Sequence, residues 1–512
     1  MDAQRPPGRD RSRLDSLPDM RELEYDVVVI GAGAIGENVA DRAVQGGMKT
    51  VIVESELVGG ECSYWACMPS KALLRSGALL RAARDVGGTR EAVTGSLDVA
   101  AVLRRRDGVT HNWNDDGQVK WLNGAHIDLE RGHARIVAPK VVEITDAAGE
   151  TTRITAAHAV AVCTGSASLL PDIPGLLAAD PWTSRDATSV QEVPSSLAVI
   201  GGGVVAAEMA TAYAGFGVDV TMIVRGSLLD KNEPFAGELV RTSLEDLGVR
   251  VLTGVSPTAA ARADDGDAQV TIELSDGGTV VADEVLVATG RVPQTQDLGL
   301  EAIGLEPGAW LRVDDSMRVV DGGGHPHGLE ADADPEQDAW LYAVGDVTHR
   351  ALLTHQGKYD ARIAGDAIAA RARGRTLSDA PWSTYTATAD HAAVPQVTFT
   401  DPEVASVGLT AKQAEQAGIR TRVVDYDISW VAGATIEADH YVGRARMVVD
   451  EDRRVLVGAT FVGASVGELL HSATVAIVGE VTIDRLWHAV PSYPTLSEVW
   501  LRLLEGYGRP TE

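Results

Sequence analysis

Two stretches of this sequence each have the pattern of a β-strand, a glycine turn and a helix. The strands are the apolar runs at residues 25 to 30 and 197 to 200. The turns are formed by Gly31, Gly33 and Gly36 in the first stretch and by Gly201, Gly203 and Ala206 in the second. Small residues at these positions let the backbone bend and approach a pyrophosphate at the start of the helix. The pattern predicts an α/β chain with two Rossmann-like dinucleotide-binding folds.

The end of the next strand differs between the two stretches. In the first, Glu54 follows the strand at residues 50 to 53, and a carboxylate there accepts hydrogen bonds from ribose hydroxyls. In the second, the strand at residues 218 to 224 is followed by Arg225. A guanidinium pairs with a 2′-phosphate in bidentate fashion, so the second fold is expected to prefer NADPH to NADH. The alternative is that Arg225 is a solvated charge at a strand end.

A cysteine pair lies in residues 59 to 71, which read GGECSYWACMPSK. In an ideal helix, residues five apart have Cα atoms about 8 to 9 Å apart, beyond the roughly 7 Å that a disulfide spans. Because Pro69 has no N–H for the carbonyl of Trp65 and crowds it, the helix is expected to be distorted here. A strained, accessible pair at Cys62 and Cys67 suits redox chemistry. Two unpaired core thiols are the alternative.

Other segments complete the expected sheets. The strand at residues 159 to 162 ends in a turn that contains Thr164 and Gly165. The strand at residues 284 to 287 ends in a turn that contains Gly290. A Gly- and Asp-rich stretch at residues 321 to 338 is interpreted as a surface loop. Beyond residue 386 the pattern changes to an α+β domain. Its expected strands lie at residues 396 to 400, 445 to 449 and 455 to 461, and its expected helices at 465 to 479 and 495 to 505.

Composition narrows the possible partners. The chain of 512 residues has a formal net charge of -28, which disfavours nucleic acids and anionic membrane surfaces. No apolar run approaches the roughly 18 residues of a membrane helix, and residues 1 to 24 are expected to be a disordered tail without a secretory signal. Three cysteines in 512 residues are too few for a disulfide framework. A cytoplasmic protein is therefore expected.

The cysteine segment, the paired glycine turns and the stretch Tyr342 to Asp346 resemble the class I pyridine nucleotide-disulfide oxidoreductases, over about residues 25 to 505. The resemblance implies two Rossmann-like domains and a C-terminal α+β dimerisation domain. The expected division is an FAD-binding domain in two parts at 25 to 190 and 311 to 385, an NAD(P)-binding domain at 191 to 310, and a dimerisation domain at 386 to 512. A homodimer is implied, with each active site completed by the other subunit.

The resemblance also implies a role for each matching residue. Cys62 would meet the substrate, Cys67 would contact the flavin, and Lys71 would pair with Glu208 near the flavin N5. The expected FAD contacts are Gly31, Gly33, Gly36, Glu54, Lys71, Thr164, Gly165 and Asp346. The expected NADPH or NADH contacts are Gly201, Gly203, Ala206, Arg225 and Gly290. No metal site is expected.

One position departs from the family. Members that reduce disulfides usually have a histidine and a glutamate five residues later, whereas this chain has Tyr493 and Glu498. His488 is outside this frame and is expected to be structural. An unperturbed tyrosine starts near a pKa of 10, so only about one in a thousand would be ionised at neutral pH. Dithiol exchange is therefore expected to be slow compared with electron transfer to a quinone or a second nicotinamide.

The resulting expectation is an FAD-dependent NAD(P)H oxidoreductase with a redox-active disulfide, similar to dihydrolipoamide dehydrogenase and acting on a small-molecule acceptor. The alternative is a soluble transhydrogenase or quinone-reducing diaphorase. Residues 504 to 512 contain no cysteine, which argues against mercury reduction. A flavoprotein reduced to a binding scaffold is also disfavoured, because Cys62, Cys67, Lys71 and Glu208 are all present.

Overall fold

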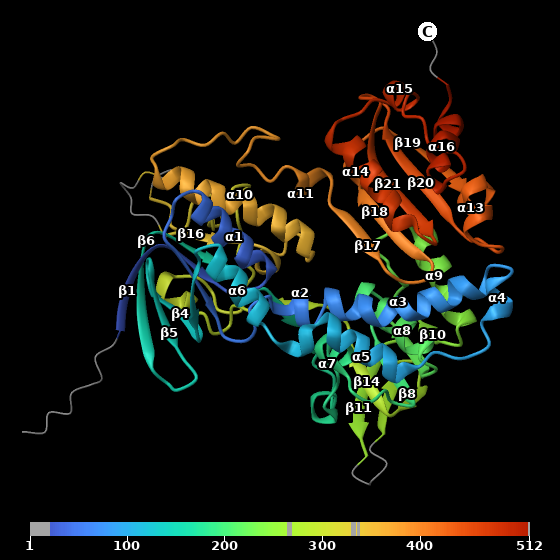
Figure 1. Cartoon of the computed structure of the whole chain (residues 1–512), viewed down its shortest axis with the longest axis horizontal. Helices are drawn as coiled ribbons and strands as arrows, with labels where there is room; N and C mark the ends of the chain where they lie inside the picture. The colour runs from blue at the N-terminus through green and yellow to red at the C-terminus, as the bar shows by residue number, and fades with distance from the viewer. Residues whose placement is uncertain (1–20, 264–268, 329–333, 335–337, 510–512) are drawn as a thin grey trace, which may run out of the picture.

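The computed structural model describes residues 21–263, 269–328, 334 and 338–509, which form three sheet-based bodies (Figure 1). The first body has a seven-stranded sheet in the order β3-β2-β1-β6-β5-β4, with β16 paired to β6. Its strands are β1 Arg21–Ile30, β2 Thr50–Glu54, β3 Asp128–Arg131, β4 His133–Ala138, β5 Val141–Thr145, β6 Thr151–Val162 and β16 Leu341–Ala343. Helices α1 (Ala34–Gln45) and α10 (Thr354–Ala372) pack together beside it. The chain therefore returns to this sheet after forming the second body.

The second body is built on a fully parallel sheet in the order β10-β9-β8-β14. Its strands are β8 Ser196–Ile200, β9 Asp219–Val224, β10 Arg250–Thr253 and β14 Glu284–Val287. Helices α8 (Val204–Gly215) and α9 (Pro234–Asp246) cross between them. A small antiparallel sheet adds β11 Pro257–Arg262, β12 Val270–Leu274 and β13 Thr279–Ala282. The strands β7 (Ser166–Ser168) and β15 (Arg291–Pro293) pair where the chain enters and leaves this body.

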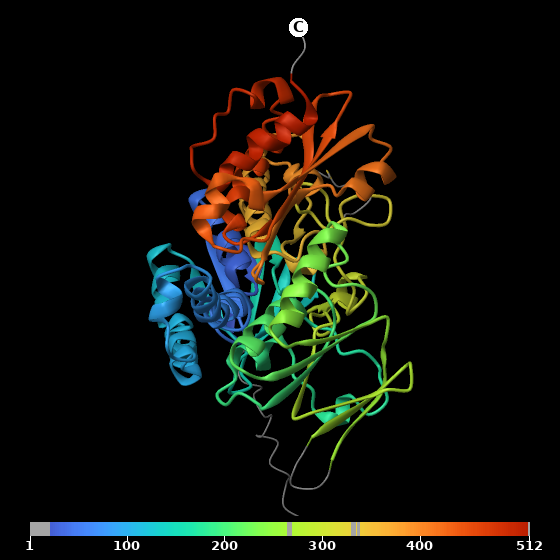
Figure 2. The same ribbon diagram turned by 90° about the vertical axis from the view of Figure 1, so that its right-hand side faces the viewer.

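The third body is a five-stranded antiparallel sheet in the order β17-β18-β21-β20-β19. Its strands are β17 Pro395–Thr398, β18 Glu403–Gly408, β19 Thr421–Asp427, β20 Arg444–Asp450 and β21 Val455–Gly463. Its helices are α12 Ala411–Gln416, α13 Ala432–Glu437, α14 Leu470–Val478, α15 Ile483–Leu486 and α16 Val499–Tyr507. Figure 2 shows this body at the top of the molecule, on the opposite side from the second body.

The remaining helices lie between these bodies. They are α2 Gly60–Tyr64, α3 Cys67–Arg84, α4 Thr89–Ala92, α5 Val99–Val109, α6 Asp116–Gly124, α7 Ser184–Ser189 and α11 Ala389–Ala392. Among them, α3 contacts both α5 and α8, so it joins the first body to the second. No helix in the described part of the chain is both long enough and apolar enough to cross a membrane.

Several expectations are corrected by the structure. Residues 21–24 are not part of a disordered tail, because they begin β1 and pair with residues 152–155 of β6; residues 1–20 lie outside the described residues. The helices expected from 465 and 495 begin at Leu470 and Val499, because each is preceded by a short 3₁₀ turn. Part of the expected loop at 321 to 338 lies outside the described residues, and in the described part no group of three or more His, Cys, Asp or Glu is arranged to hold a metal ion.

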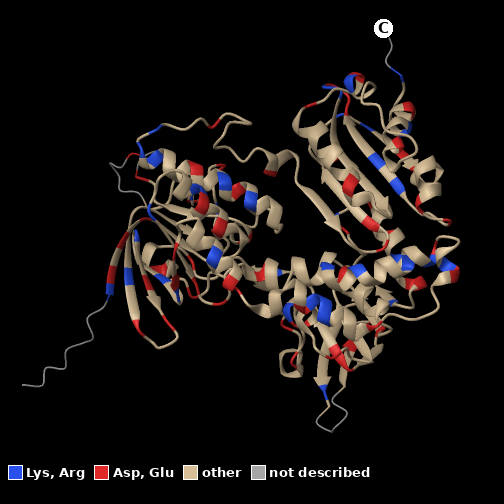
Figure 3. Ribbon diagram, viewed as in Figure 1, with Lys and Arg blue, Asp and Glu red and all other residues tan. Residues whose placement is uncertain are grey.

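Charged residues of both signs are distributed over all three bodies (Figure 3). Arg446 on β20, for example, pairs with Glu233 at the start of α9 and with Asp425 on β19. The Glu233 side chain is buried, and its other oxygen accepts a hydrogen bond from Ala411 N at 2.7 Å. These contacts fix the third body to the second.

Candidate active site

The first glycine turn is closely packed at two of its three positions. Gly31 has a φ of +101°, and a Cβ there would lie 2.5 Å from the carbonyl oxygen of Cys163. A Cβ at Gly36 would lie 1.9 Å from the carbonyl oxygen of Gly31. A Cβ at Gly33, by contrast, would meet only the Cα of Gly60, at 4.0 Å. Gly33 is the N-cap residue of α1. The open position therefore coincides with the helix start, where a pyrophosphate binds.

Glu54 is held beside this turn. One oxygen of its carboxylate accepts from Ala32 N at 2.7 Å and the other from Glu56 N at 2.8 Å. Burial raises the pKa of Glu54, while these hydrogen bonds act in the opposite direction. The carboxylate is thus fixed at the end of β2 with lone pairs left to accept from a ribose.

Polar groups around the first turn fit a bound dinucleotide. The hydroxyl of Thr164 and one oxygen of Glu37 are buried and have no hydrogen-bond partner among the described residues. Asp346 accepts from Ser166 Oγ at 2.6 Å and lies 3.8 Å from the Nε of Arg291. A buried hydroxyl without a partner is costly, and a polar ligand removes that cost. Gly165, next to Thr164, has open space at its Cβ position.

The second glycine turn is similar but less crowded. A Cβ at Gly201, which has a φ of +138°, would lie 2.3 Å from the carbonyl oxygen of Ala288, whereas a Cβ at Gly203 would meet nothing within 4 Å. Ala206 is fully buried without a clash. Arg225 follows β9, is exposed, and makes no hydrogen bond or ion pair with any described residue. Its guanidinium is available to a ligand.

The cysteine pair lies where a helix is broken, as Pro69 led us to expect. Helix α2 ends at Tyr64, residues Trp65 and Ala66 have non-helical backbone angles, and α3 begins at Cys67. The carbonyl of Trp65 accepts a hydrogen bond from Thr188 Oγ1 at 2.8 Å in place of the missing helical donor. Cys62 is not joined to Cys67 by a disulfide in this structure, which contains the pair as two thiols.

The two thiols differ in acidity. A hydrogen bond from Cys62, supported by Thr354 and Lys71, lowers the pKa of Cys67 to about 6 against the opposing effect of burial. The same hydrogen bond, together with burial, raises the pKa of Cys62. The Sγ of Cys67 lies 3.3 Å from Thr354 Oγ1, and Cys67 is the first residue of α3, where the helix dipole favours an anion. At neutral pH the thiolate is therefore on Cys67.

Lys71 lies one helical turn beyond Cys67 and pairs with Glu208 at 2.8 Å. The Glu208 carboxylate is 4% exposed, and its other oxygen accepts from Phe399 N at 2.9 Å. The Lys71 ammonium also lies 5.0 Å from the centre of the Phe399 ring. Contacts from α3 and from the third body therefore satisfy this buried carboxylate of the second body, as its burial requires.

The single chain does not form a dyad from Tyr493 and Glu498. Tyr493 is 77% exposed, and Glu498 is buried and accepts a hydrogen bond from Arg502 at 2.6 Å rather than from the phenol. Neither residue has a hydrogen bond to the cysteine pair among the described residues. His488, expected to be structural, is exposed.

Sequence reasoning missed three residues at the cysteine pair: Arg185, Thr188 and Thr354. Each lies more than 100 positions from the cysteine segment, and no motif marks it.

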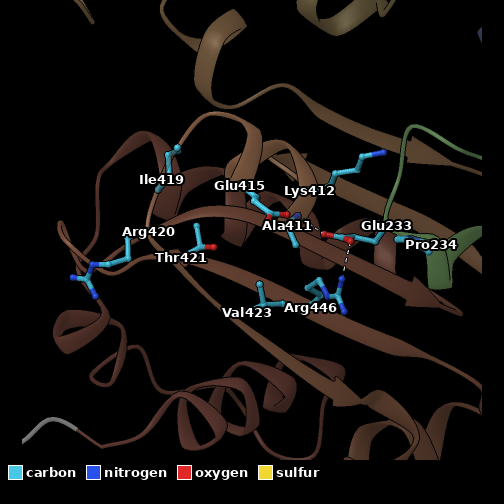
Figure 4. Close-up of a pocket in the computed structure, with 11 residues that line it drawn as sticks. Glu233, Pro234, Ala411, Lys412, Glu415, Ile419, Arg420, Thr421, Val423 and Arg446 are labelled. Atoms are coloured by element: carbon cyan, nitrogen blue, oxygen red, sulfur yellow. Dashed lines mark hydrogen bonds and ion pairs between the residues drawn. The ribbon is translucent and has the colours of Figure 1, made fainter.

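A hollow of about 600 Å³ between α9, α12 and β19 is separate from this site (Figure 4). The residues that line it include Glu233 and Arg446, whose ion pair crosses it, but none of the expected site residues.

The fold and the site together define an oxidoreductase in which two dinucleotide folds flank a pair of thiols. The chain belongs to the pyridine nucleotide-disulphide oxidoreductase family, whose model matches residues 25–370. The model of that family's dimerisation domain matches residues 394–503, which supports a homodimer. The chain is accordingly an FAD-dependent NAD(P)H oxidoreductase with a redox-active disulfide centre.

Named relatives agree with this assignment. The chain is 31% identical to a mercuric reductase from Staphylococcus aureus, over 96% of this chain and 84% of the relative. It is 32% identical to a dihydrolipoyl dehydrogenase from Thermus scotoductus, over 93% of this chain and 95% of the relative. These relatives do not favour the transhydrogenase or quinone reductase alternative.

Two solved structures share the fold. The flavoprotein disulfide reductase RclA from Escherichia coli, solved as a Cu(II) complex, matches with a TM-score of 0.77 and 22% identity over 94% of this chain and 99% of that chain. LpdA from Mycobacterium tuberculosis matches with a TM-score of 0.76 and 23% identity over the same shares.

Proposed function

We propose that this enzyme takes two electrons from NADPH, stores them in the Cys62 and Cys67 pair, and delivers them to a small molecule that carries a disulfide. The observation that carries the proposal is the asymmetry of the two thiols. Cys67 is the more acidic, at the start of α3, and Cys62 is its hydrogen-bond donor. When bound, FAD supplies the group that accepts hydride from the nicotinamide and passes the electrons to sulfur.

The proposed roles of the chain's own residues follow from their places. Cys62 attacks the acceptor, Cys67 carries the thiolate next to the flavin, and Lys71 with Glu208 orients the flavin edge. The proposed FAD contacts are Gly31, Gly33, Gly36, Glu54, Lys71, Thr164, Gly165 and Asp346. The proposed NADPH contacts are Gly201, Gly203, Ala206, Arg225 and Gly290.

The three bodies are proposed to act as an FAD domain in two parts, an NADPH domain and a dimerisation domain, with the boundaries expected from the sequence. The thiol pair and the absence of a disulfide framework support a reducing, cytoplasmic setting. Tyr493 and Glu498 of the partner subunit would face Cys62, with the phenol as the proton donor to the leaving thiolate.

A second candidate is electron transfer to a quinone or a second nicotinamide. One observation favours it: Glu498 accepts a hydrogen bond from Arg502 and not from Tyr493, so the carboxylate does not orient the phenol for proton transfer.

The deciding experiment is a set of steady-state assays with NADPH and NADH against lipoamide, glutathione disulfide, a quinone and thio-NAD. We expect a disulfide to be reduced with the highest kcat/KM, in line with the dihydrolipoyl dehydrogenase relatives and against the slow exchange expected for an unperturbed tyrosine. Cys62→Ser should abolish that activity. Tyr493→Phe should lower disulfide turnover while leaving quinone turnover within a few-fold, and Tyr493→His should raise disulfide turnover. A kcat/KM for quinone or thio-NAD that exceeds every disulfide and survives Cys62→Ser would replace this proposal with the second candidate.

A further inference from the structure

Helix α7 (Ser184–Ser189) lies against the link between α2 and α3, which consists of the non-helical residues Trp65 and Ala66. Thr188 Oγ1 lies 2.8 Å from the carbonyl oxygen of Trp65. The guanidinium carbon of Arg185 lies 4.3 Å from the centre of the Trp65 ring, a cation–π contact. One short helix therefore contacts both the backbone and the side chain of the residue that separates α2 from α3.

The same arginine also reaches the residue before Cys62. Arg185 Nε donates to Glu61, and its two terminal nitrogens donate to Glu56 at 3.1 and 2.9 Å. Glu56 and Glu61 both pair with the Arg185 guanidinium, which also lies against the Trp65 indole. Helix α7 thus contacts the residue before Cys62 and the first residue of the break that precedes Cys67.

Helix α7 is itself firmly anchored. Arg106 of α5 is fully buried and donates to the carbonyl oxygens of Thr188 and Val190, which closes the C-terminal end of α7. Tyr213 of α8 is also fully buried and donates to the carbonyl oxygen of Ala187 at 2.7 Å. Because α8 also carries Glu208, one rigid support holds both α7 and the partner of Lys71.

The link needs such support. Pro69 cannot donate to the Trp65 carbonyl, so a backbone acceptor is left without its helical partner. The hydroxyl of Thr188 fills that place, although it also lies 2.9 Å from Ser184 O in its own helix. Without these contacts the segment between α2 and α3 can change shape, and the separation of the two cysteines is no longer held within the short range that a disulfide requires.

We propose that Arg185 and Thr188 are positioning residues for the redox pair: by holding Trp65, they keep Cys62 and Cys67 adjacent and so set the equilibrium between disulfide and dithiol. In this equilibrium, at neutral pH, the S–S bond takes up two electrons and one proton to give the Cys62 thiol and the Cys67 thiolate. Adjacency favours the disulfide, since less motion is needed to close it. It also stabilises the Cys67 thiolate, because Cys62 stays within hydrogen-bonding reach, and this stabilisation of the reduced pair offsets part of the preference for the disulfide. The proposal rests on the proposed role of the pair in electron transfer.

The test equilibrates the purified flavoprotein and its variants with glutathione redox buffers and quantifies free Cys62 and Cys67 by alkylation. Thr188→Val removes the hydroxyl at nearly constant volume, and Arg185→Gln removes the cation. Each should lower the equilibrium constant for disulfide formation three- to tenfold, where tenfold corresponds to about 30 mV. Each should also raise the pH at which Cys67 becomes reactive toward iodoacetamide. Thr188→Ser, which keeps the hydroxyl, should restore both values.

Arg241→Gln is the matched control, because Arg241 pairs with Glu245 on the exposed face of α9 and does not contact the cysteine segment. It should change neither value. If Thr188→Val stays within twofold of the parent, or if Thr188→Ser shifts as far as Thr188→Val, the inference is wrong. If the parent protein's Cys62 and Cys67 are not reduced by NADPH at all, the proposed function fails instead. Thr188→Val alone decides the matter if Arg185→Gln does not fold.

Discussion

The two glycine turns have the same topology, yet they differ in how much of the binding surface the protein completes for itself. In the first, Gly36 has no room for a Cβ, and Glu54 is fixed by two backbone N–H groups. In the second, Ala206 occupies the corresponding position without a clash, and Arg225 is exposed and unpaired among the described residues. The greater preorganisation of the first turn fits its proposed role of holding FAD, and the more open second turn fits its proposed role of binding NADPH.

This contrast teaches that the third small residue of such a turn is dictated by packing as well as by the nucleotide. Helix α1 approaches the Gly31 carbonyl so closely that only glycine fits at Gly36. Ala206, at the corresponding position of α8, is accommodated. The same sequence pattern therefore imposes different constraints at its two occurrences.

The largest effect is expected from adding a methyl group to the first turn. Gly36→Ala would place a Cβ 1.9 Å from the Gly31 carbonyl oxygen. Relieving this overlap by a backbone shift should cost about 3 kcal/mol or more, with loss of bound flavin. Denaturant unfolding and the flavin absorbance of the purified protein measure both effects.

The reciprocal change, Ala206→Gly, removes a methyl group from the second turn. It should cost only about 0.5 to 1 kcal/mol, which is the ordinary penalty of glycine in a helix, and leave the flavin bound. Equal losses for the two variants would remove the distinction between the turns.

An intermediate effect is expected at Glu54. Glu54→Gln weakens two hydrogen bonds from backbone N–H groups to a carboxylate, and hydrogen bonds to charged groups contribute about 1.5 to 3 kcal/mol. The FAD dissociation constant should rise at least tenfold, as measured by flavin fluorescence after dilution. Glu22→Gln changes an exposed acid near the start of β1, where β1 pairs with β6, and is the control that should have no effect. Unchanged FAD affinity in Glu54→Gln would mean that the fixed carboxylate is only structural.

An effect limited to one of the two nicotinamide cofactors is expected at Arg225. Arg225→Ala should raise the KM for NADPH about tenfold by removing a charge-assisted contact to the 2′-phosphate, and leave the KM for NADH nearly unchanged. Arg250→Ala changes an exposed arginine at the start of β10, which pairs with β9 at the end of the strand away from Arg225, and should alter neither KM. A similar rise for both cofactors in Arg225→Ala would contradict the NADPH preference.

Local patterns allowed much of the fold to be predicted. The strand expected at residues 284 to 287 is β14, and the break near Pro69 is present, because each depends on neighbouring residues. The extension of β1 back to Arg21 was missed because it depends on pairing with β6, more than 100 positions away. For the same reason Thr188 and Thr354 could not be found, since only the folded chain brings them to Trp65 and Cys67.

The most direct test of the central claim is an anaerobic titration with NADPH that follows absorbance at long wavelength. The account predicts a charge-transfer band at two-electron reduction, because the proposed electron path places the Cys67 thiolate next to the flavin. Since the pKa of Cys67 is lowered to about 6, the band should persist from alkaline pH down to that value and fade below it as the thiolate is protonated. Cys67→Ser should abolish the band. Cys62→Ser cannot form the disulfide, so it should show the thiolate band before any NADPH is added. A band that is unchanged in Cys67→Ser would contradict the assignment of the electron path.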